Sequence, residues 1–162
     1  MDTEELKQLF YKIRDTSFSD YAPHTKLIIK DLGETVGAIS SPFADTIHIN
    51  LELFRKHKQS KEEFIGLFAH ELAHKVSYKK RSLWQRIALL WNYPFSLEKQ
   101  KCVEQEADQI AIERGYAKEL LLERKKQYQR FEKFANRMKQ IKACYLTPEE
   151  IEATLEKQED SF

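Results

Sequence analysis

The segment from Ser60 to Val76 constrains the fold most, because every local signal in it indicates one long helix. Ser60 followed by Glu63 is a capping-box pattern, which starts helices by satisfying two free backbone N–H groups. Large apolar residues then recur at helical spacing, at Phe64, Leu67, Phe68, Leu72 and Val76. We therefore expect a helix here that buries one face in the core.

The segments before this helix predict an α+β fold with a small sheet. Residues 3–14 have apolar positions at helical spacing, and Thr3 is placed to cap them. Three short β-rich runs follow at 26–30, 35–40 and 45–51, which predicts a three-stranded antiparallel or mixed sheet. The chain has only four Gly and four Pro, which favours long helices over tight turns.

The segments after the central helix predict more helices. Residues 79–98 are rich in aromatics and predict an irregular connection that covers the core, in preference to a lid or a membrane-contacting element. A helix from Ser96 or Leu97 to about Arg114 is expected to end at Gly115. A long helix from Ala117 to about Tyr145 follows, and the residues at 147–150 start a last short helix.

Composition excludes several classes of protein. The net charge of +1 gives no reason to expect nucleic acid as a partner, and the basic run at 118–142 and the acidic run at 149–160 are interpreted as solvated faces. Cys102 and Cys144 form no disulfide or thiolate-metal pattern. No apolar run approaches the roughly 20 residues of a membrane span, and the first residues do not resemble a signal peptide. We expect a cytoplasmic protein without a membrane span.

The central helix carries a metal-binding pattern at His70 and His74. Residues four apart lie one above the other on one helix face, so the two imidazoles can bind a single Zn²⁺. Glu71 is displaced by about a third of a turn, so it flanks the metal rather than binding it. In that place its carboxylate can deprotonate a water molecule on the metal.

A catalytic zinc site also needs a third protein ligand. Glu104 and Asp108 are four residues apart on the next predicted helix and share one face, whereas Glu106 faces elsewhere. We expect Glu104 to bind the metal and Asp108 to accept a hydrogen bond from a histidine N–H. Asp108 as the ligand is the alternative.

A His-Glu-x-x-His helix followed by a Glu-x-x-x-Asp helix resembles the gluzincin metallopeptidases, specifically the family of the prenyl protease Ste24 and the heat-shock protease HtpX. The soluble minimal versions, the minigluzincins, look most similar, and the resemblance covers roughly residues 26–116. It implies that Glu104 binds zinc and that Asp108 supports a zinc-bound histidine. The resemblance says little about residues 1–25 or about anything after 116. For the whole chain we expect a minimal zincin domain over 1–116, whose small sheet packs on the active-site helix and the glutamate helix, and a helical C-terminal extension over 117–162 packed on it.

The resemblance implies a zinc-dependent endopeptidase that acts on a protein or peptide, with Glu71 as general base. We expect the substrate to pair with an edge strand formed by Thr46, Ile47, His48, Ile49 and Asn50, in which His48 is an outward residue and not a ligand. Minigluzincins are described as latent, so a C-terminal segment over the cleft is expected. No motif identifies the side chain that stabilises the oxyanion, and the candidates are Tyr78, Arg114, Tyr116 and Tyr128.

Two further interpretations stay open on the sequence. The chain could be a zincin-fold regulatory or binding module without turnover, with the basic helix at 118–142 as its surface for a protein or nucleic acid. The presence of Glu71 weighs against this, because a module that only binds needs no general base. Cys144 is expected to be a buried packing thiol rather than a switch that blocks the metal. The sequence predicts no oligomeric state.

Overall fold

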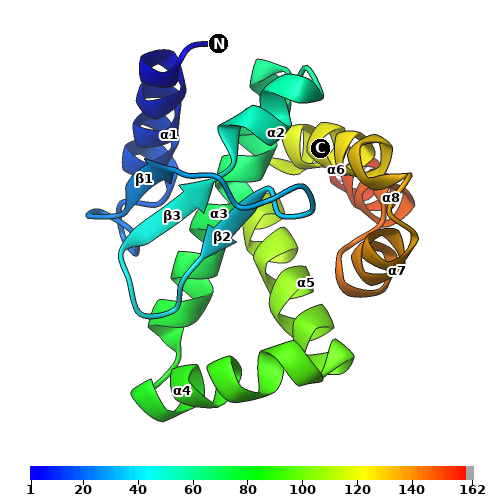
Figure 1. Cartoon of the computed structure of the whole chain (residues 1–162). Coiled ribbons are helices and arrows are strands. Elements are labelled where there is room, and N and C mark those ends of the chain that lie inside the picture. Colours follow the sequence, from blue (N-terminus) through cyan, green and yellow to red (C-terminus); the bar gives the residue numbers. More distant parts are fainter. Residues whose placement is uncertain (160–162) are drawn as a thin grey trace.

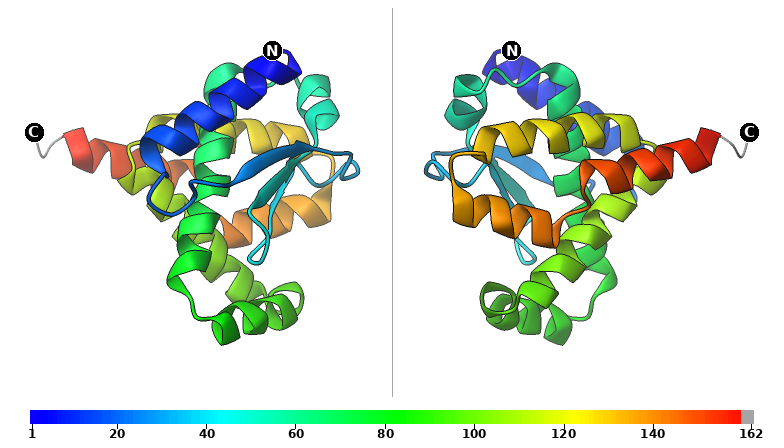
Figure 2. Two further views of the ribbon diagram at one scale, coloured as in Figure 1. Left: turned by 90° about the vertical axis from the view of Figure 1, so that its left-hand side faces the viewer. Right: turned by 90° about the vertical axis from the view of Figure 1, so that its right-hand side faces the viewer.

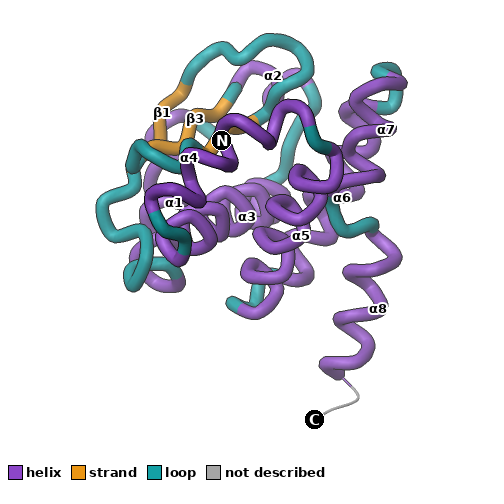
Figure 3. The backbone as a smooth tube through the Cα atoms, turned by 90° about the horizontal axis from the view of Figure 1, so that it is seen from below, coloured by secondary structure: helices purple, strands orange, loops and turns teal. Residues whose placement is uncertain are grey.

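The computed structural model describes residues 1–159, and within them the fold is α+β, with a small sheet against several helices (Figure 1). Helices dominate the chain, and the three strands lie together on one side (Figure 3). In chain order the elements are α1 (Thr3–Ser17), β1 (Lys26–Ile29), β2 (Ala38–Ser40), β3 (Thr46–Ile49), α2 (Leu51–Lys56), α3 (Lys61–Lys80), α4 (Leu83–Asn92), the 3₁₀ turn η1 (Tyr93–Phe95), α5 (Leu97–Glu113), α6 (Ala117–Phe131), α7 (Ala135–Cys144) and α8 (Pro148–Glu159).

Helix α3 lies at the centre of the fold, and its predicted start is confirmed. Ser60 accepts a hydrogen bond from the Glu63 N–H, and the Glu63 carboxylate accepts one from the Ser60 N–H. All five apolar residues of the predicted stripe are buried. Phe68 meets Phe10 of α1 edge to face, with ring centroids 5.3 Å apart, so the N-terminal helix packs directly on α3. That helix is capped by Asp2 and not by Thr3.

The predicted three-stranded mixed sheet is confirmed, with strand order β1-β3-β2. Strand β1 is parallel to β3, and β2 is antiparallel to it. Leu27, Ile47 and Ile49 are buried and belong to the same hydrophobic cluster as the apolar face of α3. The prediction of an edge strand at residues 46–50 (Thr46, Ile47, His48, Ile49, Asn50) is wrong, because β3 is paired on both sides. Strands β1 and β2 form the two edges instead.

The prediction of an irregular connection at 79–98 is also wrong. The segment forms α4, which Ser82 and Gln85 start with a complete capping box. No residue of α4 is buried, so its aromatics do not cover the core. Figure 1 shows α4 running across the lower ends of α3 and α5, at the edge of the molecule. Helix α5 matches its prediction, and Gly115 follows it with a φ of +88° that favours glycine.

One long helix from Ala117 to Tyr145 is not formed, because the chain turns back between α6 and α7. The turn lets Phe131 of α6 and Ile141 of α7 pack together on Leu53 of α2, in a second small hydrophobic cluster. A straight helix would hold Phe131 and Ile141 about 15 Å apart along its axis. Burial of these side chains therefore overrides the continuous helical pattern. The start signal before α8 is confirmed, with Thr147 and Glu150 exchanging hydrogen bonds.

The C-terminal helices are packed closely on the rest of the chain. Gly66 of α3 faces the backbone of α6, where an added Cβ would lie 2.2 Å from the Glu119 carbonyl oxygen. Leu120 of α6 and Ile151 of α8 belong to the main hydrophobic cluster. In Figures 1 and 2, α1 lies on one side of α3, and α6, α7 and α8 lie on the other. These helices therefore border α3 and α5 at the level of the site described next.

Candidate metal centre

Helices α3 and α5 bring His70, His74 and Glu104 together in one buried triangle. The Nε2 atoms of His70 and His74 are 3.1 Å apart. Oε2 of Glu104 is 3.2 Å from Nε2 of His70 and 3.3 Å from Nε2 of His74. Ligand atoms around a tetrahedral Zn²⁺ with bonds of 2.0–2.1 Å are about 3.3–3.4 Å apart. The triangle therefore has nearly the dimensions of one face of a zinc coordination tetrahedron.

The chemistry of these three groups fits a cation as well. Two imidazole Nε2 lone pairs that face each other repel unless a proton or a metal ion lies between them. Two imidazoles and one carboxylate also form the ligand set of a common class of catalytic zinc site. His70, His74 and Glu104 are each 5–6% exposed, so water cannot readily screen their charges. The residues present fit Zn²⁺.

Asp108 lies directly behind the triangle. Its Oδ1 is 2.8 Å from Nδ1 of His70 and accepts a hydrogen bond of 2.7 Å from Arg124 of α6, while its Oδ2 accepts the Leu146 N–H at 2.9 Å. Asp108 and Arg124 are both buried. The carboxylate selects the His70 tautomer with the proton on Nδ1, which leaves the Nε2 lone pair for a metal. The spacing in the sequence indicates Asp108, whereas nothing local indicates Arg124.

Electrostatic effects within the triangle also favour a positive charge there. Burial alone would raise the pKa of Glu104, but the charge of His74 and hydrogen bonds from both histidines hold it well below the ordinary value. Burial would lower the pKa of His70, but Asp108 and Glu104 raise it to about 10. A proton therefore occupies the cluster when no other cation is there. Metal ligands behave in this way, since metal and proton compete for the same lone pairs.

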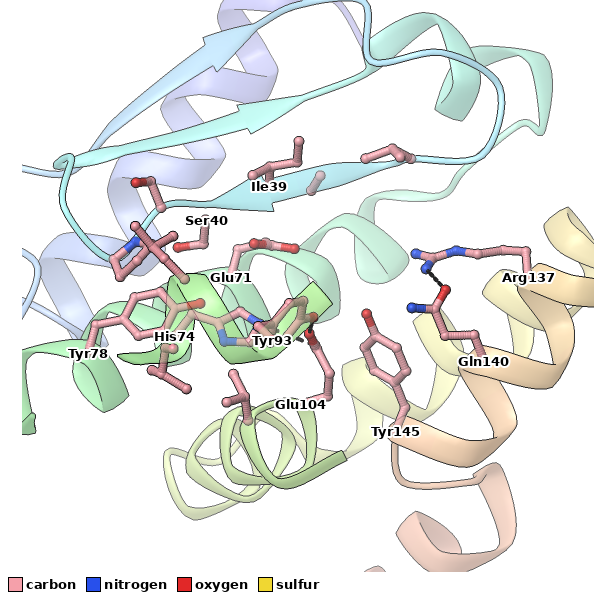
Figure 4. A pocket seen from close by; sticks show the side chains of 17 residues that line it. Ile39, Ser40, Glu71, His74, Tyr78, Tyr93, Glu104, Arg137, Gln140 and Tyr145 are labelled. Carbon is pink, nitrogen blue, oxygen red and sulfur yellow. Dashed lines mark hydrogen bonds and ion pairs between the residues drawn. The ribbon is translucent and has the colours of Figure 1, made fainter. Parts of the chain in front are cut away.

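Glu71 lies beside the triangle without belonging to it. Its side chain lines a cavity that opens in front of the triangle, and it lies beneath Ile39 and Ser40 of β2 (Figure 4). Burial raises the pKa of the Glu71 carboxyl, the negative charge of Glu104 adds to this, and His74 and His70 partly offset it. A carboxylate whose pKa is raised toward neutrality is a stronger base than an exposed one.

The cavity in front of the triangle has a volume of about 460 Å³. Strand β2 and residues 41–42 form one wall, and α7 forms another through Arg137 and Gln140 (Figure 4). Arg137 donates to Gln140 at 2.7 Å, and Gln140 donates to Gln100 of α5 at 2.7 Å. Helix α7 is thereby hydrogen-bonded to α5 beside the site.

Three tyrosines face the cavity, at 78, 93 and 145. The Tyr93 hydroxyl donates to Oε1 of Glu104, which directs Oε2 toward the histidines. The Tyr78 ring stacks on His74, and the Tyr145 ring centroid is 5.6 Å from that of His70. Burial and the charge of Glu104 raise the pKa of all three phenols, so they remain hydrogen-bond donors at neutral pH.

Of the four candidates for oxyanion stabilisation, only Tyr78 lies at the site. The Tyr116 hydroxyl is 2.7 Å from the Ser17 hydroxyl, Arg114 pairs with Asp20, and Tyr128 packs on the second hydrophobic cluster. Tyr93 and Tyr145 are the residues that sequence reasoning missed. Tyr93 lies in the segment predicted to be irregular, and Tyr145 lies at the predicted end of a helix, so no periodic signal marks either residue.

Three further side chains have defined places. Lys75 is buried, and its ammonium donates to the carbonyl oxygens of Ser41 and Ala44 at 2.7 and 2.8 Å, which fixes the loop at the rim of the cavity. Cys144 is buried, and its thiol is 3.8 Å from Oε1 of Gln100. His48 of β3 lies outside the metal-binding triangle.

Comparison of the chain with known protein families, with curated proteins and with solved structures gives no match. Helices that could span a membrane are absent from residues 1–159.

Proposed function

We propose that this chain is a zinc-dependent endopeptidase of the gluzincin type, acting on a protein or peptide in the cytoplasm. The observation that carries the proposal is a buried carboxyl, Glu71, beside a triangle of two imidazoles and one carboxylate with zinc-like spacing. A site that only stores a metal needs no such base. In this proposal residues 1–116 are the catalytic unit, with the sheet packed on α3 and α5, and α6 to α8 are an extension.

Five residues of the chain would have distinct roles in hydrolysis. His70, His74 and Glu104 hold the metal, and Asp108 fixes the tautomer of His70. Zn²⁺ bound there would supply a Lewis acid that lowers the pKa of water and polarises a carbonyl group. Glu71 takes a proton from the attacking water and returns it to the leaving amine. Its burial beside two histidines suits a group that must carry a proton in both directions.

The free edge of β2 supports a place for the substrate. An extended peptide can add to a sheet edge through backbone hydrogen bonds, and Ala38, Ile39 and Ser40 of β2 border the cavity (Figure 4). A peptide on this edge would pass in front of Glu71. The phenols of Tyr78 and Tyr145 face the same cavity and are donors for the carbonyl oxygen that gains negative charge.

The closed surroundings of the site support low basal activity. His70, Glu71, His74 and Glu104 are only 5–7% exposed, and α7 is hydrogen-bonded to α5 beside the cavity. We propose that the enzyme is latent and that displacement of α7 opens the site. Gln140→Ala removes the hydrogen bond from α7 to Gln100 of α5, and Arg137→Ala removes the side chain that orients Gln140, so the double variant is expected to raise activity.

Cleavage of an unfolded protein in the presence of zinc tests the proposal. The wild type and the Arg137→Ala/Gln140→Ala variant are expected to cleave, and Glu71→Gln in either background is expected to be inactive while it still binds one equivalent of zinc. Glu62→Gln is the matched control, because Glu62 lies on the same helix and is exposed. If all variants bind zinc and none cleaves, the chain is a zinc-binding module without turnover and the proposal fails.

A further inference from the structure

The end of the molecule formed by α4, η1 and the first residue of α5 exposes large apolar side chains. We call this the α4 surface, and its six apolar members are each 53–88% exposed: Leu83, Trp84, Leu90, Trp91, Phe95 and Leu97. Among residues 1–159, these six make up half of all exposed large hydrophobic residues. Contiguous exposed apolar patches in soluble domains mark sites of interaction.

The apolar side chains of α4 lie on one face of the helix. Residues 83, 84, 90 and 91 are spaced so that they share one face of α4. The helix lies across one end of the molecule in Figure 1, and Figure 2 shows it at the same end from both sides. Leu89 and Tyr93 line the cavity of the candidate metal centre, and Leu90 borders that cavity as well as the exposed face. The exposed face therefore stands out from the molecule beside the mouth of that cavity.

Basic residues flank this apolar face on both sides in the sequence. Residues 79–101 contain six Lys and Arg and a single acid, Glu98, whereas the rest of the chain has 21 Lys and Arg against 25 Asp and Glu. Lys79 and Lys80 are exposed at the end of α3, and Lys99 and Lys101 at the start of α5. The net charge of +1 therefore combines a basic segment at 79–101, in which Arg81 is paired with Glu106 of α5, with a slightly acidic remainder.

We propose that the α4 surface docks onto a lipid bilayer that contains anionic lipids. The apolar side chains would enter the boundary between headgroups and acyl chains, and the lysines would contact the headgroups. Trp is the residue most typical of that boundary. This proposal does not depend on the enzymatic one.

Two other occupants fit the observations less well. A second copy of the chain in a twofold contact would bring the same cations of both copies together, which costs energy. A peptide partner usually lies in a groove, whereas the groove between α4 and α5 is lined by the other face of α4, through Gln85, Ala88 and Asn92. A bilayer with negative headgroups can bury the apolar face and can also pair with the flanking lysines.

Intrinsic fluorescence gives a direct test, because Trp84 and Trp91 are the only tryptophans in the chain. The full chain is mixed with vesicles of phosphatidylcholine and phosphatidylserine, with pure phosphatidylcholine vesicles as the comparison. A blue shift and quenching by bromine-labelled lipid are expected with the anionic vesicles, and both should weaken at high salt. Absence of any shift with anionic vesicles overturns the proposal.

Co-sedimentation of variants locates the contact. Trp84→Ser with Trp91→Ser is expected to weaken vesicle binding by at least about tenfold, and Lys99→Glu with Lys101→Glu by a similar factor. The matched controls are Leu122→Ser and Lys133→Glu with Lys139→Glu, which alter exposed residues of other elements and should bind as the wild type does. Equal losses in the controls would overturn the proposal. Light scattering that shows a Trp84-dependent dimer without vesicle binding would overturn it in favour of self-association.

Discussion

Replacement of Asp108 by Asn tests the network behind the candidate metal centre. Asp108 is fully buried and receives three hydrogen bonds, from His70 and Arg124 at Oδ1 and from the Leu146 N–H at Oδ2. Asn has nearly the same shape but no charge. Its amide NH₂ would also face a donor in either orientation, because every partner of Asp108 is a donor.

The expected cost follows from burial. Loss of one partner from a buried ion pair costs about 3–5 kcal/mol, since the other charge is left uncompensated. Here the charge left behind belongs to Arg124, which is 1% exposed. We therefore expect Asp108→Asn to lose about 3–5 kcal/mol of unfolding free energy. Because Asp108 also orients His70, zinc affinity should fall about 10–100-fold.

Urea unfolding in the presence of a chelator measures the first quantity, and competition with a chelator of known affinity measures the second. Glu113→Gln is the matched control, since it makes the same kind of change at an exposed position of α5. Arg124→Met combined with Asp108→Asn should be less destabilised than the sum of the two single variants, because it removes both buried charges. A loss below about 1 kcal/mol with unchanged zinc affinity would refute the reasoning.

Three other predictions concern packing, metal and donors. Gly66→Ala should lower the free energy of unfolding by about 1–3 kcal/mol, because the new methyl group would meet the Glu119 carbonyl oxygen and separate α3 from α6. Thermal or urea unfolding measures this loss, and an unchanged stability would contradict this packing. Zinc at about 100 times its dissociation constant should add about 2.7 kcal/mol to the stability of the wild type and clearly less to that of His74→Ala. If zinc shifts the melting temperature of both proteins equally, the metal binds elsewhere. Tyr145→Phe should lower kcat of the proposed peptidase about 10²–10³-fold and leave stability and KM nearly unchanged. An unchanged kcat would show that Tyr145 does not donate to the oxyanion.

The features that could be predicted from the sequence are those set by neighbours within one turn of helix. The start of α3 depends on Ser60 and Glu63, which are three residues apart, and the end of α5 depends on Gly115. The pairs His70/His74 and Glu104/Asp108 share helix faces because four residues make about one turn. The sequence also indicates the start of α4 through Ser82 and Gln85, although its aromatic content was interpreted as a cover over the core.

Local signals fail where a distant contact decides the outcome. The continuous helical pattern after Ala117 is interrupted because Phe131 and Ile141 are buried together on Leu53. The alternation in β3 indicates that one face of the sheet is buried and does not indicate whether the strand lies at an edge, and β3 lies in the middle because β1 and β2 pair on its two sides. Neither result can be deduced from residues within a few positions of the break or the strand.

The sequence by itself therefore determined the central helix, the spacing of the two histidines, and the face shared by Glu104 and Asp108, because i and i+4 geometry is a local property of the backbone. Only the tertiary structure decided which side chains surround that cluster and which face solvent. Arg124 reaches Asp108 and Tyr145 reaches His70 because α6 and α7 fold back against α3 and α5. The tryptophans of α4 are exposed because that helix crosses the ends of α3 and α5, and burial depends on what the rest of the chain leaves uncovered.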